Sequence, residues 1–321
     1  MPEPRMSRSE ARASAEGKRR GWGPGASDEC PQIVNAMTVD VEDYFQVSAF
    51  DDVVSRDSWA SRESRVVANT SRLLDLFAEA RVHATFFVLG WVAERFPSLV
   101  KRIADGGHEV ASHGYHHELL YTMTPEQFRT DVRRARQVIQ DASGMPVVGY
   151  RAPSFSVTRS TLWALDVLIE EGHEYDASVF PIHHDRYGIP DAERHAHAWT
   201  RRSGRLLEFP ASTVRIGGTN LPIAGGGYFR LLPYAWTRWG MRRVNLRERQ
   251  PVVFYLHPWE IDPEQPRLPV GAATRLRHYS GLRRTKHRLT RLMRDFTFDT
   301  VQSVLNLGVS VADAPEARRR A

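Results

Sequence analysis

The sequence predicts an α/β fold in which helical crossovers join parallel strands, either as a barrel or as a doubly wound sheet. From Ile33 onward, short apolar segments rich in β-branched and aromatic residues alternate with longer amphipathic segments. Hydrophobic residues make up 41% of the 321 residues, and no apolar run approaches the roughly 20 residues needed to cross a bilayer. The mean hydropathy of −0.44 is typical of a soluble globular protein.

Strands and helices are expected in strict alternation up to residue 180. The expected strands span residues 33–39, 83–90, 108–114, 147–153 and 173–180, and the expected helices span residues 70–80, 97–108, 124–144 and 159–172. The helix over residues 124–144 has the clearest start, because Thr124 is an N-cap, Pro125 is the first helical residue and Gln127 completes a capping box. After Pro181 the pattern loosens into loops rich in Gly and Pro, until a β-prone run over residues 251–257.

Composition divides the chain into three parts. Residues 1–30, rich in Arg, Ser, Gly, Glu and Pro, are expected to form a disordered leader. Residues 31–260 contain all the expected strands, and residues 261–321 are expected to form a basic extension packed on that domain. The leader has no apolar core typical of a secretory signal, and the single cysteine, Cys30, excludes an internal disulfide framework. We therefore expect a cytoplasmic protein.

The basic charge is concentrated near the C-terminus. Residues 270–321 contain eleven Lys and Arg against four Asp and Glu, an excess of seven, so the rest of the chain is close to neutral given the net charge of +6. Leu282, Leu289 and Met293 recur there at roughly helical spacing. One interpretation is a docked helix with a solvated basic face, and another is a patch for anionic lipid head groups or a phosphorylated carrier. Nucleic acid is not expected, because no binding module accompanies the charge.

Acidic side chains follow the first expected strand. Asp40, Glu42 and Asp43 lie within four residues, where like charges are costly without a cation or hydrogen-bonding partners. Strand alternation would put Asp40 and Glu42 on one face and point Asp43 away. Two acids on one face could divide metal binding and general-base work, although a hydrated or helix-capping cluster remains the alternative.

Histidines follow the third expected strand in the segment His113-Gly-Tyr-His-His117. His113 and His117, together with a carboxylate from the first strand, would form a set of two histidines and one acid that leaves coordination positions open. Such a set suits zinc or another divalent ion that activates water. His116 is the competing second ligand, at a spacing that is less usual for this role.

Three further residues lie near other strand ends, where functional groups of parallel sheets gather. Arg151 could hold a carboxylate in a fixed geometry, or it could be a surface residue. His257 follows a strongly apolar run and could deliver a proton to a leaving amine, or it could be structural. Asp176 could tune that histidine or cap a turn.

In this order, the segments TVDVED, SHGYHH, RAPS, YDAS and LHP resemble the motifs of the polysaccharide deacetylase family, carbohydrate esterase family four. The resemblance extends from about Ile33 to Trp259 and implies a distorted (β/α) barrel. The segments TVDVEDYFQVSAF, GGGYFRLLPY and HYSGLRRTKHRLTRLMRDFTF are similar to a subgroup found with exosortase-linked exopolysaccharide loci, in which a C-terminal extension follows the catalytic domain.

The resemblance also implies a role for each residue. Glu42, His113 and His117 would bind a divalent metal ion, with zinc as the expected ion. The first motif departs from the family's usual pair of adjacent aspartates, so Asp43 remains an alternative ligand to Glu42. The remaining implied roles are Asp40 as the base, Arg151 as its orienting partner, His257 as the acid, Asp176 as a supporting acid and the backbone N–H near Ser154 as an oxyanion donor.

The resulting expectation is a hydrolase that removes N-acetyl groups from an exopolysaccharide or its precursor. The basic C-terminal region adds the hypothesis of a lipid-linked glycan and peripheral contact with the inner membrane surface. The alternatives are an amidohydrolase for a small non-sugar amide and a non-catalytic carbohydrate-binding protein. Late aromatic residues could stack on sugar rings or belong to the core; they are Tyr228, Phe229, Trp236 and Trp259.

Overall fold

Nine strands form the central sheet of the protein, which a computed structural model describes over residues 33–307. The strands are β1 (Val34–Val41), β2 (Thr85–Val88), β3 (Glu109–Ser112), β4 (Gly149–Tyr150), β5 (Tyr175–Asp176), β6 (His197–Arg201), β7 (Gly204–Glu208), β10 (Val253–Leu256) and β11 (Thr297–Asp299). Their order is β10-β1-β2-β3-β4-β5-β7-β6, and β11 pairs with the start of β1. All pairings are parallel except the β6–β7 hairpin.

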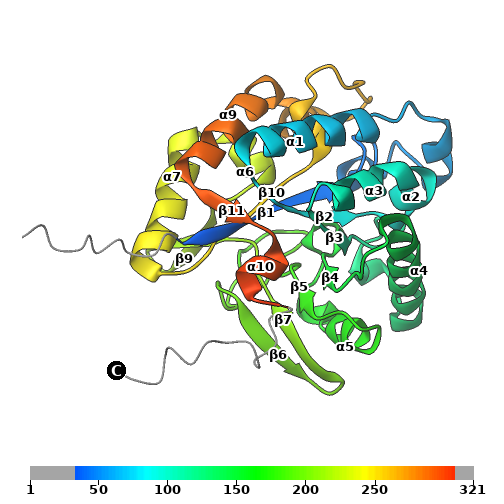
Figure 1. The fold of residues 1–321 in the computed structure, drawn as a ribbon, viewed down its shortest axis with the longest axis horizontal. Coiled ribbons are helices and arrows are strands. Elements are labelled where there is room, and N and C mark those ends of the chain that lie inside the picture. The colour runs from blue at the N-terminus through cyan, green and yellow to red at the C-terminus, as the bar shows by residue number, and fades with distance from the viewer. Residues whose placement is uncertain (1–32, 308–321) are drawn as a thin grey trace, which may run out of the picture. The chain divides into compact units, whose positions relative to one another are not determined.

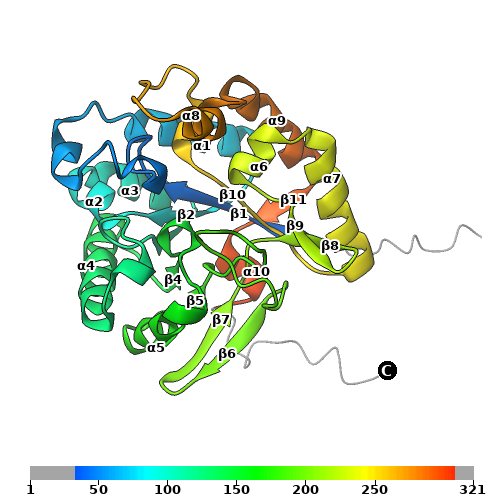
Figure 2. The same ribbon diagram turned by 180° about the vertical axis from the view of Figure 1, so that it is seen from behind.

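The parallel sheet and its outer helices confirm the predicted α/β class. Figures 1 and 2 show the strands in an arc with helices outside it, as in a distorted (β/α) barrel. Within residues 33–307 no pairing joins β7 to β10, so the barrel is open. A second sheet, the hairpin of β8 (Thr213–Ile216) and β9 (Thr219–Pro222), follows β7 along the chain, and a bridge then pairs Gly225 with Tyr255 of β10.

Ten helices accompany these strands in the described residues. They are α1 (Val66–Ala80), α2 (Gly90–Arg95), α3 (Pro97–Asp105), α4 (Pro125–Ser143), α5 (Trp163–Glu170), α6 (Gly226–Leu231), α7 (Tyr234–Arg243), α8 (Ala272–Tyr279), α9 (Leu282–Asp295) and α10 (Val301–Leu305). The capping box predicted for α4 is present, since Thr124 Oγ1 accepts from the N–H of Gln127 and the Gln127 side chain accepts from the N–H of Thr124. None of these helices has the length and apolar character that a membrane span requires.

The main core lies between the sheet and the helices of its outer layer. Leu73 and Phe77 of α1 and Val100 and Ile103 of α3 are fully buried against β1 and β2. Burying such a side chain contributes roughly 1.5–3 kcal/mol. β1 is buried along its whole length after Val34, because β2 lies on one side and β10 and β11 on the other. Its carboxyl end is therefore held rigidly.

Residues 181–250 differ from the prediction, because they form β6–β9, α6 and α7 rather than loops alone. The Gly217–Gly218 pair that suggested a loop is the tight turn of the β8–β9 hairpin, where both residues have positive φ. The helix expected from Leu282 to Met293 is α9, and a further helix, α8, precedes it across Gly281. A Cβ at Gly281 would lie 2.5 Å from the carbonyl oxygen of Arg230, so this close approach requires glycine.

The division of the chain into a leader, a catalytic domain and a C-terminal extension is not tested by the structure and stays a prediction. The expected disordered leader and the last fourteen residues of the expected extension lie outside the described residues. The described part of the extension contributes β11 to the central sheet, and Leu289 and Leu292 of α9 are buried in the main core.

Replacing Thr124 by Ala should lower the free energy of unfolding by about 1 kcal/mol, because the N-cap oxygen that satisfies Gln127 is lost. Thr130→Ala is the matched control, since Thr130 is an exposed residue inside the same helix and alanine favours helix. Chemical denaturation of both variants checks this. An equal loss of unfolding free energy in Thr124→Ala and Thr130→Ala would contradict the assignment of Thr124 as the N-cap.

Candidate functional site

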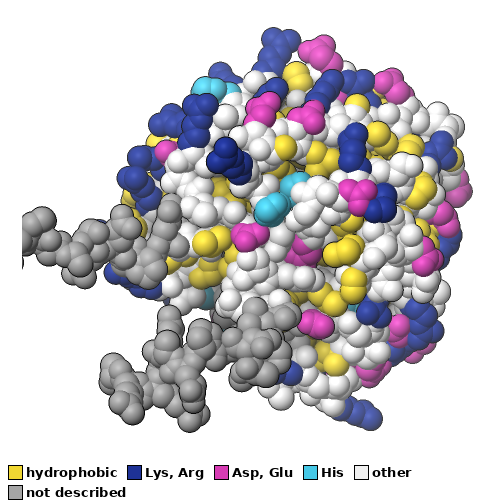
Figure 3. Space-filling model, viewed as in Figure 1, with side chains coloured by type: hydrophobic (Ala, Val, Ile, Leu, Met, Phe, Trp, Pro, Cys, Tyr) yellow, Lys and Arg dark blue, Asp and Glu magenta, His cyan; other side chains and the backbone are white. Residues whose placement is uncertain are grey.

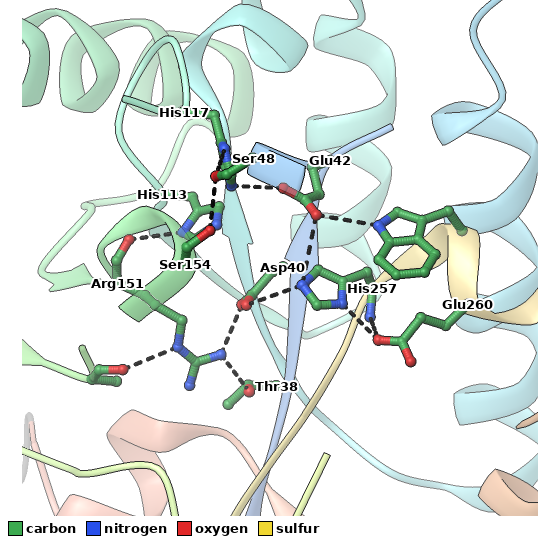
Figure 4. Close-up of polar contacts among 12 residues, drawn as sticks. Thr38, Asp40, Glu42, Ser48, His113, His117, Arg151, Ser154, His257 and Glu260 are labelled. Carbon is green, nitrogen blue, oxygen red and sulfur yellow. Dashed lines mark hydrogen bonds and ion pairs between the residues drawn. The ribbon is translucent and has the colours of Figure 1, made fainter. Parts of the chain in front are cut away.

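The carboxyl ends of β1, β3, β4 and β10 bring together the polar side chains that the sequence singled out (Figure 4). β1 supplies Asp40 and is followed directly by Glu42, whereas His113 follows β3, Arg151 follows β4 and His257 follows β10. Parallel pairing makes these ends meet at one edge of the sheet. Residues more than 200 positions apart in the sequence thus become neighbours.

Glu42, His113 and His117 form a cluster whose possible ligand atoms all lie within 4.8 Å of one another. All three side chains are buried. Two imidazoles and a carboxylate are a donor set that suits zinc and similar divalent ions. His116 is not part of this cluster; its ring packs edge-on against Tyr115, with ring centroids 4.4 Å apart.

The loop after β3 directs the two histidines to one place. Gly114 takes a positive φ of 73°, and the Asp131 carboxylate of α4 accepts from the N–H groups of Tyr115 and His116. This contact turns the chain sharply, so that His117 returns toward His113 with a positive φ of 54°. Such a conformation in a non-glycine residue is strained and is held by its surroundings.

Hydrogen bonds fix which nitrogen of each histidine faces the cluster. His113 Nδ1 lies 2.7 Å from the carbonyl oxygen of Arg151, which can only accept, so Nδ1 carries the proton and Nε2 carries a lone pair. Burial lowers the pKa of His113 to about 4, which keeps this ring neutral. His117 Nδ1 lies 3.4 Å from Ser48 Oγ, a contact that likewise directs Nε2 toward the cluster.

The Glu42 carboxylate is ionised and placed so that it could bind a cation. Burial alone would raise its pKa, but the charges of His117 and His257 lower the pKa of Glu42 to about 2 and keep it ionised. Its Oε2 lies 2.8 Å from His117 Nε2 and has no other close partner within residues 33–307. A buried carboxylate and two imidazole rings gathered in one place form a donor set that a divalent ion can occupy. The three residues therefore could bind a metal ion.

Asp40 is held by a buried ion pair. Its Oδ1 accepts from Arg151 Nη1 at 2.7 Å, and both side chains are nearly inaccessible. The same guanidinium also donates to Thr38 Oγ1 at 2.7 Å and to the carbonyl oxygen of Ala177 at 3.1 Å. The carboxylate is thus fixed in one orientation, with Oδ2 directed toward His257 Nε2 at 3.8 Å.

His257 lies between the two acids and a third carboxylate. Its Nε2 lies 3.6 Å from Glu42 Oε1, and its Nδ1 lies 2.6 Å from Glu260 Oε1. Burial lowers the pKa of His257, but the Glu42 charge and the Glu260 hydrogen bond outweigh burial and raise it to about 9. Glu260 is itself buried and accepts from Arg230 at 2.6 Å. This arrangement presents a protonated Nε2 toward Asp40 and Glu42.

Ser154 lies at the edge of the site. Its Oγ hydrogen-bonds to Ser48 Oγ at 2.8 Å, and its backbone takes a positive φ of 52°. The peptide after Pro153 therefore bends beside the cluster (Figure 4). The oxyanion role of the N–H in this segment stays a prediction.

Asp43, the alternative ligand, lies outside the metal cluster. Its Oδ2 accepts from Ser64 Oγ and from the N–H groups of Arg65 and Val66, and its Oδ1 accepts from the N–H of Tyr44. Asp43 therefore caps the start of α1 from a distance. The physical reason is that β1 has ended at Val41, so the side chain of Asp43 points to the helix.

Asp176 forms no hydrogen bond or ion pair with His257 in the described chain. The carboxylate that contacts His257 and raises its pKa is that of Glu260. Asp176 is fully buried on β5 opposite Glu208 of β7. Burial raises the pKa of Asp176 to about 6, and burial together with the Asp176 charge raises the pKa of Glu208. Asp176 accepts from Ser178, whose hydroxyl accepts from the N–H next to Arg151, so it supports the arginine loop.

Sequence reasoning missed Glu260, Thr38 and Ser48. Glu260 had a usable signal, because Pro258 and an acid three residues after His257 match a capping box, which the structure contains. Thr38 and Ser48 had none, since their contacts depend on side-chain direction in the folded chain.

Comparison with known proteins agrees with this geometry. Residues 44–168 match the polysaccharide deacetylase family model. Residues 177–306 match a family described as a domain of unknown function, DUF3473. The chain is 36% identical over 114 residues to a peptidoglycan deacetylase of Helicobacter pylori, which is 36% of this chain and 37% of that protein.

A chitooligosaccharide deacetylase of Rhizobium leguminosarum bv. trifolii is 33% identical over 114 residues, which cover 36% of this chain and 49% of that protein. The matched part thus spans less than half of these relatives. The crystal structure of a Mycobacterium smegmatis protein assigned as a polysaccharide deacetylase covers 85% of this chain and 94% of its own, with 22% identity and a TM-score of 0.50, and supports the fold. The family model and these relatives thus show that part of the chain, including residues 44–168, is similar to polysaccharide deacetylases.

Replacing Glu42 and Asp43 separately by their amides tests which of the two acids is a metal ligand. Asp43→Asn should lower the free energy of unfolding by about 1–3 kcal/mol, because buried N–H groups lose a charged acceptor, while zinc affinity stays close to that of the wild type. Glu42→Gln should instead weaken zinc binding at least tenfold. Calorimetric zinc titration and chemical denaturation of both variants measure this. Loss of zinc binding in Asp43→Asn with unchanged stability would overturn the assignment.

Proposed function

We propose that the protein is a metal-dependent hydrolase that removes N-acetyl groups from an amino-sugar-containing exopolysaccharide or its precursor and releases acetate. The observation that carries this proposal is the convergence of a Glu42–His113–His117 cluster with the Asp40–Arg151 pair and His257 at one sheet edge. The similarity to proteins named peptidoglycan and chitooligosaccharide deacetylases supports an N-acetylated glycan as substrate.

The cluster residues would hold the metal ion, for which their donor set favours zinc. The ion would supply Lewis acidity at the acetyl carbonyl and a lowered pKa for the attacking water. His113 and His117 would hold the ion through Nε2, while their Nδ1 atoms contact the Arg151 carbonyl and Ser48. These outer contacts keep both rings oriented without the ion.

Proton transfer is assigned to Asp40 and His257. Asp40, fixed by Arg151, accepts the proton of the attacking water through its Oδ2. His257, held protonated by Glu42 and Glu260, donates from Nε2 to the nitrogen of the departing amine. The backbone N–H near Ser154 would donate to the oxyanion that forms on the acetyl group.

More specifically, we propose that the protein belongs to the exosortase-associated subgroup. Its substrate would be a lipid-linked glycan at the cytoplasmic side of the inner membrane. The match of residues 177–306 to DUF3473 is compatible with a characteristic C-terminal region. Lys and Arg side chains are frequent over the part of the surface where α7 and α9 lie (Figure 3). α9 alone contains six of them within fourteen residues, a density that favours contact with an anionic surface.

Asp40→Asn should lower kcat for acetate release from N-acetylated oligosaccharides by roughly 10² to 10⁴, because the general base is lost. Zinc content should remain near one ion per chain, since Asp40 is outside the cluster. His113→Ala should lose both zinc and activity. An assay of released acetate, with zinc analysis of each variant, measures these effects.

Asp185→Asn is the control for the removal of one acid, because Asp185 is exposed and outside the cluster. Undiminished activity in Asp40→Asn would refute the proposed base. Absence of acetate release from every N-acetylated glycan by the zinc-loaded wild type would refute the proposed function and favour a small-amide substrate or a binding role.

Vesicle binding tests the membrane proposal. The wild type should sediment with vesicles that contain 30% phosphatidylglycerol and not with neutral phosphatidylcholine vesicles, and binding should fall about tenfold between 0.05 and 0.5 M salt because exposed charges are screened. Replacing Arg283, Arg284 and Lys286 by Gln should weaken binding in the same way. Binding that is independent of lipid charge and salt would rule out this mode of membrane contact.

A further inference from the structure

A cavity of about 430 Å³ adjoins the metal cluster. Trp259 links the two, because its indole lines the cavity while Nε1 donates to Glu42 Oε1 at 3.2 Å. On another wall, Val47 and Ala49 flank Ser48, which contacts His117. The volume falls in the range of roughly 300–1,000 Å³ that is typical of ligand pockets. A glycan whose N-acetyl group lies at the cluster would therefore extend into this cavity with its next unit.

Aromatic rings line the cavity. Tyr187 and Tyr228 are only half-buried, and Trp259 stacks on the His257 ring with centroids 5.0 Å apart. Phe229 and Trp236, the other late aromatics, pack instead in or against the main core. Trp259 also stacks on His278, and Tyr187 stacks on His184 and Phe180, so Tyr228 is the half-buried ring that remains for contact with a pyranose.

The cavity is also cationic. Arg186, Arg277 and His184 line it, and no Asp or Glu lines it. Neither Arg186 nor Arg277 forms an ion pair, a side-chain hydrogen bond or a cation–π contact within the described part of the chain. Arg230, which also lines the cavity, is already neutralised by Glu260. Two exposed guanidinium groups from separate segments therefore line one cavity, and Asp51, the acid whose charge interacts with Arg186, lies outside that lining.

We propose that this cavity is a subsite for an anionic sugar unit, one that carries a carboxylate or a phosphate, next to the N-acetylated sugar. The proposal rests on the proposed deacetylase function and adds the chemical class of the substrate. Tyr228 would contact the apolar face of the ring, and Arg186 and Arg277 would bind its anionic group. Guanidinium groups suit both carboxylates and phosphates because they donate two parallel hydrogen bonds.

Two pairs of probes distinguish a carboxylate from a phosphate as the anionic group of the sugar unit. A hyaluronan tetrasaccharide, in which N-acetylglucosamine alternates with glucuronate, is compared with the same tetrasaccharide after reduction of its carboxylates to alcohols. A short-chain isoprenyl diphosphate-linked N-acetylglucosamine is compared with methyl N-acetylglucosaminide. In the zinc-loaded Asp40→Asn variant, which prevents turnover, calorimetry measures the Kd of each probe.

The anionic member of at least one pair should bind about tenfold more tightly than its neutral partner, and this preference should narrow as salt is raised. The double variant R186Q/R277Q should lose the preference. R275Q is the matched control, because Arg275 is an exposed residue of the same helix that does not line the cavity. The single variants R186Q and R277Q serve if the double variant does not fold.

Equal affinity for charged and neutral probes, or a preference that survives in R186Q/R277Q, would overturn the subsite. Wild-type acetate release from the same glycans separates this result from the proposed function. Acetate release without an arginine-dependent preference refutes the subsite alone. An arginine-dependent preference without acetate release from any glycan refutes the deacetylase function and leaves an anionic-glycan binding site.

Discussion

The buried guanidinium of Arg151 is the constraint on which the site depends. Arg151 is only 1% exposed, and its charge is compensated by Asp40 and by the carbonyl of Ala177. Leaving a buried charge unpaired costs about 3–5 kcal/mol, so the arginine and Asp40 must remain together in the folded chain. This pairing holds the end of β1 against the loop after β4. The carbonyl of the same residue orients His113, so one position sets both the proposed base and a proposed ligand.

The arrangement of charge around His257 follows from that constraint. Asp40 and Glu42 project from the same strand end, and the single imidazole lies within 4 Å of both. Glu42 Oε2 has His117 Nε2, another proposed ligand atom, as its one close partner among the described residues, so the atoms of the cluster compete for one another. Such local conflict in an otherwise well-paired sheet is typical of a site shaped for a ligand rather than for stability.

Strand ends made much of the site predictable from the sequence. Asp40 and Glu42 lie beside one histidine and Asp43 lies apart, as alternation predicted, although β1 ends at Val41, before Glu42 and Asp43. The destination of Asp43 could not be derived, since capping of α1 depends on a loop of more than twenty residues returning to β1. Glu260 was missed although its contact with His257 belongs to a capping box that Pro258 and the spacing of three residues indicate. The strands within residues 181–250 were hidden because their short, half-exposed segments carry little periodicity.

The C-terminal region is structurally part of the site. The stretch that matches polysaccharide deacetylases, residues 44–168, contains His113, His117 and Arg151, whereas His257 lies in the stretch that matches DUF3473. Glu260 orients His257 and is itself held by Arg230 of α6, whose guanidinium donates to the carbonyls of His278 and Ser280 at the end of α8. The turn after β10 and helices α6 and α8 therefore form one support for the proposed acid. Helix α8 also carries Arg277 to the cavity, so one helix both supports Glu260, through Arg230, and lines the proposed subsite.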